Sequence, residues 1–302
     1  MKKVDSRLAK KIEREDFIIT AELLPQAEAD GSATEAAIKA LGDAPLAVNV
    51  ADNPYGVALS SLAGSVALLK AGAEPVYQLL TRDRNRIALQ SDLLAAAYLG
   101  IKNVLCLSGY HQTLTGSNES ANVYDIDSTQ LIQTAKNMRD EGVLLDGTKI
   151  TGGFSVLAGA TANPSLRPLE LNIIQLIKKV EAGASFIQTQ AVFDIESFEQ
   201  WLQAACNESI TEKTAILVGI LPLDGAEEAE KLRETYTDFY IPDEVVERLK
   251  EAGNSDAQKQ EGLTICAEMI KKLKEINGVR GIHILSGGKE AIVPELIAAA
   301  GL

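Results

Sequence analysis

The chain has 302 residues, 46% of them hydrophobic and 24% charged, which is enough to bury a large core. A formal net charge of −13 argues against non-specific binding to nucleic acid or to anionic membranes. Three scattered cysteines and only two histidines argue against a disulfide framework, an iron–sulfur cluster held by this chain and a histidine-rich metal site.

The N-terminal segment Met1–Asp16 is charged throughout and is predicted to be an extension or helix outside the main fold. It lacks the apolar stretch of a signal peptide, and no run of about 18 apolar residues occurs anywhere in the chain. We therefore expect a cytoplasmic protein without a membrane span.

From residue 17 onward, short apolar runs alternate with longer amphipathic ones. The predicted strands are Phe17–Leu24, Leu46–Ala51, Glu74–Leu80, Val104–Leu107, Thr151–Ala158, Ser185–Gln190, Ala215–Leu221 and Gly278–Leu285. The predicted helices are Ala33–Leu41, Leu59–Ala71, Arg84–Leu99, Ser128–Glu141, Pro168–Ala182, Ile195–Ala205, Ala226–Tyr236, Pro242–Glu251, Ala257–Ile276 and Glu290–Ala299. About eight strand-then-helix units predict an α/β fold, a single (β/α)₈ TIM barrel over residues 17–302 with extra helices before the last strand.

Three similar sequence segments link a predicted helix to the next predicted strand: Ala71–Pro75, Leu99–Asn103 and Ala182–Phe186. Each places a glycine just after the helix, where a left-handed backbone commonly ends it. We expect these joints at the bottom of the barrel, which leaves the opposite end for ligands. No segment rich in Pro, Gly or Ser divides the chain into domains.

The carboxyl ends of the strands should form the ligand-binding mouth. The residues there are Glu22, Asn49–Asn53, Gln78–Arg86, Ser108–His111, Ala158–Pro164, Thr189–Gln190, Gly219–Pro222 and Ser286–Lys289.

Two of these positions carry charge and allow two interpretations each. Glu22 lies in an apolar strand, so it is either a general acid with a raised pKa or a strand-end carboxylate with a structural partner. The run Thr81–Arg86 either binds an anionic group through its arginines or starts a helix with self-paired charges, with Asp83 as the cap and the arginines in solvent.

Three further positions are less specific. A buried Gln190 amide at the mouth needs hydrogen-bond partners, which a pterin or flavin ring would supply. His111 is either an acid–base or stacking residue or an exposed loop histidine. Lys179 precedes the joint at Ala182–Ala184, and nothing around it in the sequence distinguishes it from a solvated lysine.

Taken together, five segments resemble the methylenetetrahydrofolate reductase family in order along the chain. They are Ala21–Glu22, Asp83–Arg86, Gly100–Gly109, Lys178–Asp194 and Gly219–Pro222. The likeness is greatest to the short bacterial form found beside a partner subunit in anaerobic one-carbon pathways. It implies a (β/α)₈ barrel with a non-covalent flavin, FAD or alternatively FMN, that reduces 5,10-methylenetetrahydrofolate to 5-methyltetrahydrofolate by hydride transfer.

The resemblance also implies roles for individual residues. Glu22 matches the general acid, Gln190 matches a residue that binds the pterin, and Tyr110 stands beside them in the catalytic set. The positions implied to bind the flavin are Ala51, Gln78, Ser108, Gly109, Tyr110, Tyr124, Asp125, Asn163 and Lys179.

Some positions depart from the family pattern. Tyr110 replaces an aspartate, Ser108 an arginine and Asn163 a histidine, and Pro25–Gln26 replaces a Pro-Pro pair. Tyr110 is neutral near pH 7, so it cannot supply the charge of the aspartate. Two alternatives to the reductase follow: a flavin-free folate-dependent one-carbon transferase and a non-catalytic folate- or flavin-binding subunit. Because this chain has no cluster ligands, we also predict a redox partner with iron–sulfur clusters, in a homo- or hetero-oligomer.

Overall fold

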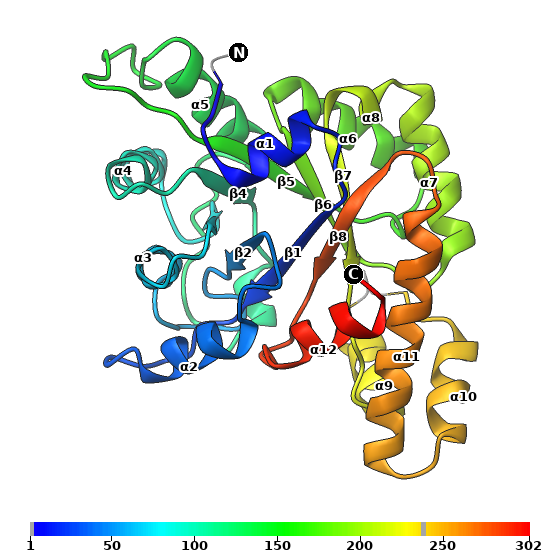
Figure 1. Cartoon of the computed structure of the whole chain (residues 1–302). Helices are drawn as coiled ribbons and strands as arrows, with labels where there is room; N and C mark the ends of the chain where they lie inside the picture. The colour runs from blue at the N-terminus through cyan, green and yellow to red at the C-terminus, as the bar shows by residue number, and fades with distance from the viewer. Residues whose placement is uncertain (1–2, 237–239) are drawn as a thin grey trace.

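The structure, a computed structural model, describes residues 3–236 and 240–302. Eight parallel strands follow one another in sequence order around a closed barrel, which confirms the predicted fold (Figure 1). The strands are β1 (Ile18–Leu23), β2 (Ala47–Val50), β3 (Pro75–Leu80), β4 (Asn103–Leu107), β5 (Leu157–Ala162), β6 (Phe186–Ala191), β7 (Ala215–Ile220) and β8 (Val279–Ile284).

Helices surround the barrel, and three of them separate β7 from β8, as the sequence predicts. They are α1 (Arg7–Glu13), α2 (Ser32–Leu41), α3 (Ser61–Lys70), α4 (Arg86–Tyr98), α5 (Ser128–Asp140), α6 (Leu169–Ala182), α7 (Ile195–Asn207), α8 (Ile210–Lys213), α9 (Ala226–Thr235), α10 (Asp243–Glu251), α11 (Ser255–Lys274) and α12 (Ile292–Ala299), with a 3₁₀ turn η1 (Gln112–Leu114). Figure 1 shows α9 and α10 beside the end of the barrel to which the strand arrows point.

The fifth strand lies later in the chain than the sequence predicted. Thr151–Ala158 was expected to form it, whereas β5 begins at Leu157, whose N–H donates to the carbonyl of Lys102. The strand is rich in alanine and glycine, so its sequence carries a weak β signal. Its small residues are required by packing, because a Cβ atom on Gly159 would come within 2.2 Å of the Phe186 ring.

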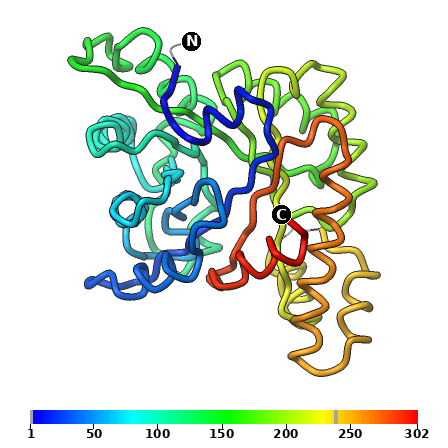
Figure 2. The backbone as a smooth tube through the Cα atoms, in the orientation of Figure 1, coloured from blue at the N-terminus to red at the C-terminus, as the bar shows by residue number. Residues whose placement is uncertain are grey.

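Two hydrophobic cores hold the fold together. One lies between the strands and the outer helices, and the other fills the barrel interior with Ile18, Val76, Leu105 and Phe186 among its members. The interior core also includes Leu8, which is fully buried. Helix α1 therefore closes the bottom of the barrel, and Figure 2 shows the N-terminal segment crossing that end.

Glu74 fixes α1 at this position. Its carboxylate accepts hydrogen bonds from the backbone N–H groups of Arg7 (2.6 Å) and Leu8 (2.9 Å), and from the Asn103 amide (3.0 Å). These helix N–H groups have no partner inside the helix, so a carboxylate there satisfies them and also interacts favourably with the helix dipole.

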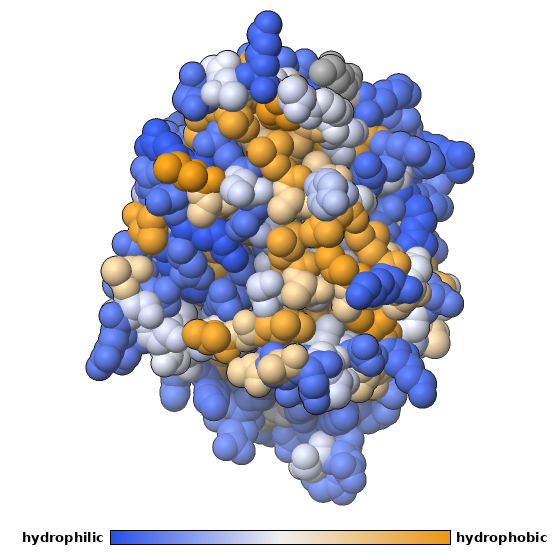
Figure 3. All heavy atoms as spheres, turned by 90° about the vertical axis from the view of Figure 1, so that its left-hand side faces the viewer, coloured by the Kyte–Doolittle hydropathy of each residue, from blue (hydrophilic) through white to orange (hydrophobic). Residues whose placement is uncertain are grey.

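The outer surface carries an apolar groove of about 770 Å³ between α2 and α3, with Ile38, Leu62 and Val66 in its lining. Figure 3 shows hydrophobic residues gathered on the side of the molecule that lies at the left in Figure 1. Within residues 3–236 and 240–302, no helix combines the length and apolar character needed to cross a bilayer.

We expect Leu8→Ala to lower the free energy of unfolding by about 2–5 kcal/mol, because it leaves a cavity in the interior core. Leu171→Ala on the exposed face of α6 is the control and should change stability by no more than about 0.5 kcal/mol. Urea denaturation measures both. Equal effects of the two substitutions would show that α1 does not stabilise the barrel.

Candidate active site

A buried polar layer crosses the barrel interior below the mouth. The Gln188 amide accepts from Asn49 (2.7 Å) and donates to Asn49 and Thr20 (3.1 Å each), and the Thr20 hydroxyl lies 2.9 Å from His283 Nδ1. Burial lowers the pKa of His283 to about 3, so its ring is neutral at physiological pH. This layer forms the floor of the mouth and separates it from the apolar interior core.

Glu22 lies two residues beyond Thr20 on β1, directly above this floor. Gln78 of β3 donates a hydrogen bond to its carboxylate at 3.4 Å. Burial raises the pKa of Glu22 to about 7, and the negative charge of Glu290 acts in the same direction. The carboxyl group can therefore hold or release a proton near neutral pH, as a general acid must.

A cavity of about 170 Å³ opens elsewhere on the barrel, between β5, β6 and α6. Its lining includes Asn163, Lys179 and Gln190, which the sequence analysis assigned to ligand binding. The Lys179 ammonium donates to the Thr161 carbonyl at 2.7 Å, and burial lowers its pKa. The Gln190 amide makes no hydrogen bond to any described residue and is available to a ligand.

The turn after β4 forms another part of the mouth. Gly109 has φ +84°, and its carbonyl accepts from the Tyr124 hydroxyl at 3.2 Å. The Ser108 hydroxyl accepts from the N–H of Ser128 at 3.4 Å, which ties the turn to the start of α5. Ala51, just after β2, is buried, and because its side chain is only a methyl group it could contact a ligand mainly through its backbone.

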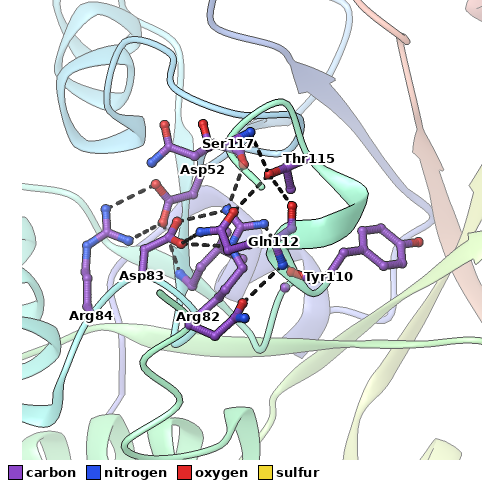
Figure 4. Close-up of polar contacts among 12 residues, drawn as sticks. Asp52, Arg82, Asp83, Arg84, Tyr110, Gln112, Thr115 and Ser117 are labelled. Atoms are coloured by element: carbon purple, nitrogen blue, oxygen red, sulfur yellow. Dashed lines mark hydrogen bonds and ion pairs between the residues drawn. The ribbon is translucent and has the colours of Figure 1, made fainter. Parts of the chain in front are cut away.

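The segment after β3 contains the self-paired charges of the second interpretation, but Arg82 is not in solvent and Asp83 is not the helix cap (Figure 4). Arg82 was expected either to bind an anion or to lie in solvent, yet it is 2% exposed and paired with Asp83 through Nε–Oδ1 at 2.7 Å. Its guanidinium also donates to the carbonyls of Asn53 (2.9 Å) and Tyr110 (3.3 Å), and Asp83 accepts from Gln112 at 2.8 Å. A buried arginine needs such a set of acceptors, and here it joins the loops after β2, β3 and β4.

Asp83 was also predicted to cap the next helix, and this is wrong. Asn85 is the N-cap of α4, because its side chain accepts from the N–H groups of residues 87 and 88. Arg84 pairs with buried Asp52 at 2.6 Å, and Arg86 pairs with Asp125 at 2.8 Å. Asp125, implied by the resemblance to contact the flavin, thus has its carboxylate engaged by Arg86.

Tyr110 extends away from this polar cluster in Figure 4. Its ring centroid lies 5.5 Å from that of Tyr236, with an angle of 39° between the ring planes. His111 is exposed, and its ring forms hydrogen bonds with Thr113 and Asn122. This environment favours the interpretation of His111 as an exposed loop histidine.

The structure thus joins Glu22 to Gln78 at the mouth, and it places Gln190 and Lys179 together in the cavity between β5, β6 and α6. Sequence reasoning missed several groups whose roles depend on contacts between distant segments: Gln112, Gln188, Tyr236 and Glu290. Only Gln188 carried a signal, as a polar residue inside the predicted strand Ser185–Gln190. Within the described part of the chain, no group of three or more His, Cys, Asp or Glu side chains could hold a metal.

A closed barrel with an acid of raised pKa, amide side chains and a half-buried lysine at the strand carboxyl ends is typical of enzymes and binding proteins for small molecules. The sequence model of the methylenetetrahydrofolate reductase family matches residues 7–301. The chain therefore belongs to this family.

The sequence identity between this chain and individual relatives is low. A probable methylenetetrahydrofolate reductase (NADPH) of Caenorhabditis elegans is 23% identical over 247 residues, 80% of this chain and 34% of the relative. The 5,10-methylenetetrahydrofolate reductase of Escherichia coli K12 is 28% identical over 131 residues, 43% of each chain. This chain thus spans a third to under half of the length of these relatives.

Among solved structures, an uncharacterized protein from Clostridium thermocellum that binds two copies of 5-methyl-5,6,7,8-tetrahydrofolic acid has the same fold. Its TM-score is 0.63 at 14% identity, with 96% of both chains covered.

The raised pKa of Glu22 predicts how stability depends on pH. Between pH 4.5, its ordinary pKa, and about 7, the folded protein holds a proton that the unfolded chain releases. Stability should therefore fall as pH rises through this window, by at most about 3 kcal/mol. Glu22→Gln should remove this component, so urea denaturation from pH 4.5 to 8 should show a flatter profile. Parallel profiles for the two proteins would contradict the assignment.

Proposed function

We propose that this protein reduces 5,10-methylenetetrahydrofolate to 5-methyltetrahydrofolate with a bound flavin, and that Glu22 is the general acid. The observation that carries the proposal is the half-buried Glu22 carboxyl group at the mouth, which accepts a hydrogen bond from Gln78 and whose pKa is raised to about 7. Family membership supports the substrate class. A reduced folate is also the ligand named for the Clostridium thermocellum protein.

Glu22 would protonate the nitrogen that leaves when the imidazolidine ring of the substrate opens. A carboxylic acid with a pKa near the working pH is both protonated often enough and acidic enough for this transfer. Gln78 orients the carboxyl group through its hydrogen bond at 3.4 Å. Gln190 offers a free donor and a free acceptor, which suits the edge of a pterin ring.

The residues at the cavity between β5, β6 and α6 fit a flavin. Lys179 is a half-buried ammonium group whose hydrogen-bond acceptor is a neutral carbonyl, so an anionic phosphate would improve its surroundings. Amide groups of Asn163, Gln190 and Gln78 could contact the ring. The bound flavin would supply the hydride, and the protein would position the folate and control the proton.

The electron donor, an iron–sulfur partner, the choice between FAD and FMN, and the oligomer stay predictions.

Glu22→Gln should reduce methylenetetrahydrofolate reduction by about 10²- to 10⁴-fold, because the amide cannot donate the proton. Turnover is measured with a reduced viologen as donor, which removes the dependence on a physiological partner. The affinity for 5-methyltetrahydrofolate, measured by calorimetry, should change little because the amide has nearly the same shape. An unchanged turnover number would eliminate Glu22 as the acid.

Lys179→Met should weaken the binding of FAD or FMN by about tenfold or more, because a charge-assisted hydrogen bond to the phosphate is lost. Lys178→Met, on the exposed face of the same helix, is the matched control and should bind flavin as the wild type does. Quenching of flavin fluorescence measures both. A wild-type protein that shows no visible flavin spectrum after reconstitution would refute the flavin-dependent reaction.

A second candidate function is folate binding without reduction. It is favoured by one observation, the neutral Tyr110 at the turn after β4 where a charged group would assist the reaction. Tight binding of 5-methyltetrahydrofolate without turnover, with reduced viologen and reconstituted flavin, would support it over the reductase.

A further inference from the structure

The turn that follows β8 brings a glutamate back to the first strand of the barrel. The N–H of Lys289 donates to the Ser286 carbonyl at 3.0 Å, and the two residues between them, Gly287 and Gly288, have φ +61° and +80°. Left-handed backbone at two successive positions favours glycine. The tight turn precedes α12 (Figure 1), and Glu290, which follows it, is only 8% exposed.

The Glu290 carboxylate completes the hydrogen bonding of β1 at the point where β8 ends. The ladder between β1 and β8 ends at Ala21, whereas the ladder between β1 and β2 continues to Leu23. The carbonyl of Leu23 accepts a hydrogen bond from the β2 side, so the N–H of Leu24, in the same peptide group, points to the side that β8 has left. Glu290 Oε1 accepts from this N–H at 3.1 Å. A buried N–H without a partner is costly, so this contact stabilises the end of β1.

This contact brings the Glu290 carboxylate to the part of β1 that carries the proposed acid. Glu22 and Leu24 are two residues apart on extended backbone, which separates their Cα atoms by about 7 Å and directs both side chains to the same face. A change in the position of Leu24 would therefore also change the position of Glu22.

The negative charge of Glu290 is not neutralised by the neighbouring lysine. The Lys289 ammonium pairs instead with Asp224, just before α9, at 2.6 Å and with Glu228, in α9, at 3.0 Å. Within residues 3–236 and 240–302, none of the ion pairs includes Glu290, which accepts its second hydrogen bond from the Ser286 hydroxyl at 3.5 Å.

The other titratable groups that face Glu22 are neutral at physiological pH. Burial raises the pKa of Tyr55, on the loop after β2, to about 12, and burial lowers the pKa of His283, in the polar layer, to about 3. Burial is also the largest cause of the raised pKa of Glu22; the Gln78 hydrogen bond opposes it, and the charge of Glu290 adds to it.

We propose that Glu290 is a positioning residue for Glu22: it fixes the end of β1 through Leu24 and holds a negative charge on the same side of the mouth. This inference rests on the proposed function, in which Glu22 gives its proton to the substrate. The fixed strand keeps the carboxyl group in place. The neighbouring charge opposes the loss of its proton, so more of the acid is protonated at neutral pH.

Glu290→Gln separates the charge from the hydrogen bond, because the amide oxygen can still accept from Leu24. In the wild type, viologen-driven reduction should slow as pH rises through the pKa of Glu22, since only the protonated acid donates. In the variant this decline should occur at a pH lower by roughly 0.5–1 unit, while the rate at low pH stays within about twofold of wild type. Glu295→Gln removes the same charge from the exposed face of α12 and is the matched control, with an unchanged profile.

Glu290→Asp tests the hydrogen bond, because it keeps the charge but shortens the side chain that reaches Leu24. The rate should fall about three- to tenfold at every pH, while the pH of the decline stays near the wild-type value. A wild-type rate would show that the contact does not position the acid. Where Glu290→Gln does not fold, as judged by circular dichroism, this variant still decides the positioning role.

Infrared spectroscopy follows the same titration without the reaction. The carbonyl band of protonated Glu22 is the band that Glu22→Gln removes, and its pH midpoint should be lower in Glu290→Gln than in wild type. A wild-type protein that reduces no methylenetetrahydrofolate, although the midpoint moves, would refute the proposed function alone. An active wild type whose midpoint and pH profile are unaffected by Glu290→Gln would refute only the role of Glu290.

Discussion

The hydrogen-bonded layer of Thr20, Asn49, Gln188 and His283 divides the barrel interior into two environments. Below it, apolar side chains pack around Leu8 of α1; above it, the mouth is polar. Buried polar groups are tolerated inside a barrel only when they satisfy one another, and this layer does so across four strands. Glu22 lies on the mouth side of this layer, where partial burial and the charge of Glu290 raise its pKa.

A second network, on the rim, determines the shape of the mouth. Buried Arg82 joins the loops after β2, β3 and β4, and Arg84 with Asp52 supports it from the side. Because the guanidinium groups of Arg82 and Arg84 are already bound to acceptors within the protein, they are not available to an anionic ligand. Lys179 is the half-buried cation in the lining of the cavity, and the aromatic rings of Tyr110 and Tyr236 pair at the turn after β4.

This distribution distinguishes the chemistry at the two sides of the mouth. Glu22 and Gln78 contact each other between β1 and β3, whereas the ammonium group of Lys179 and the amide groups of Asn163 and Gln190 gather between β5, β6 and α6. The proposed reaction would use such a separation, because its acid needs partial desolvation while a phosphate group would need polar partners.

The sequence by itself determined the barrel and placed Glu22 near the end of its first strand, because these follow from local periodicity and from glycine-ended helices. It misplaced β5, since alanine and glycine give little β signal until Phe186 packs against them. It also could not join Arg82 to the carbonyls of Asn53 and Tyr110, place Glu290 near Glu22, or bring Tyr236 to Tyr110. Those contacts join segments brought together only by closure of the barrel, so only the tertiary structure decided them.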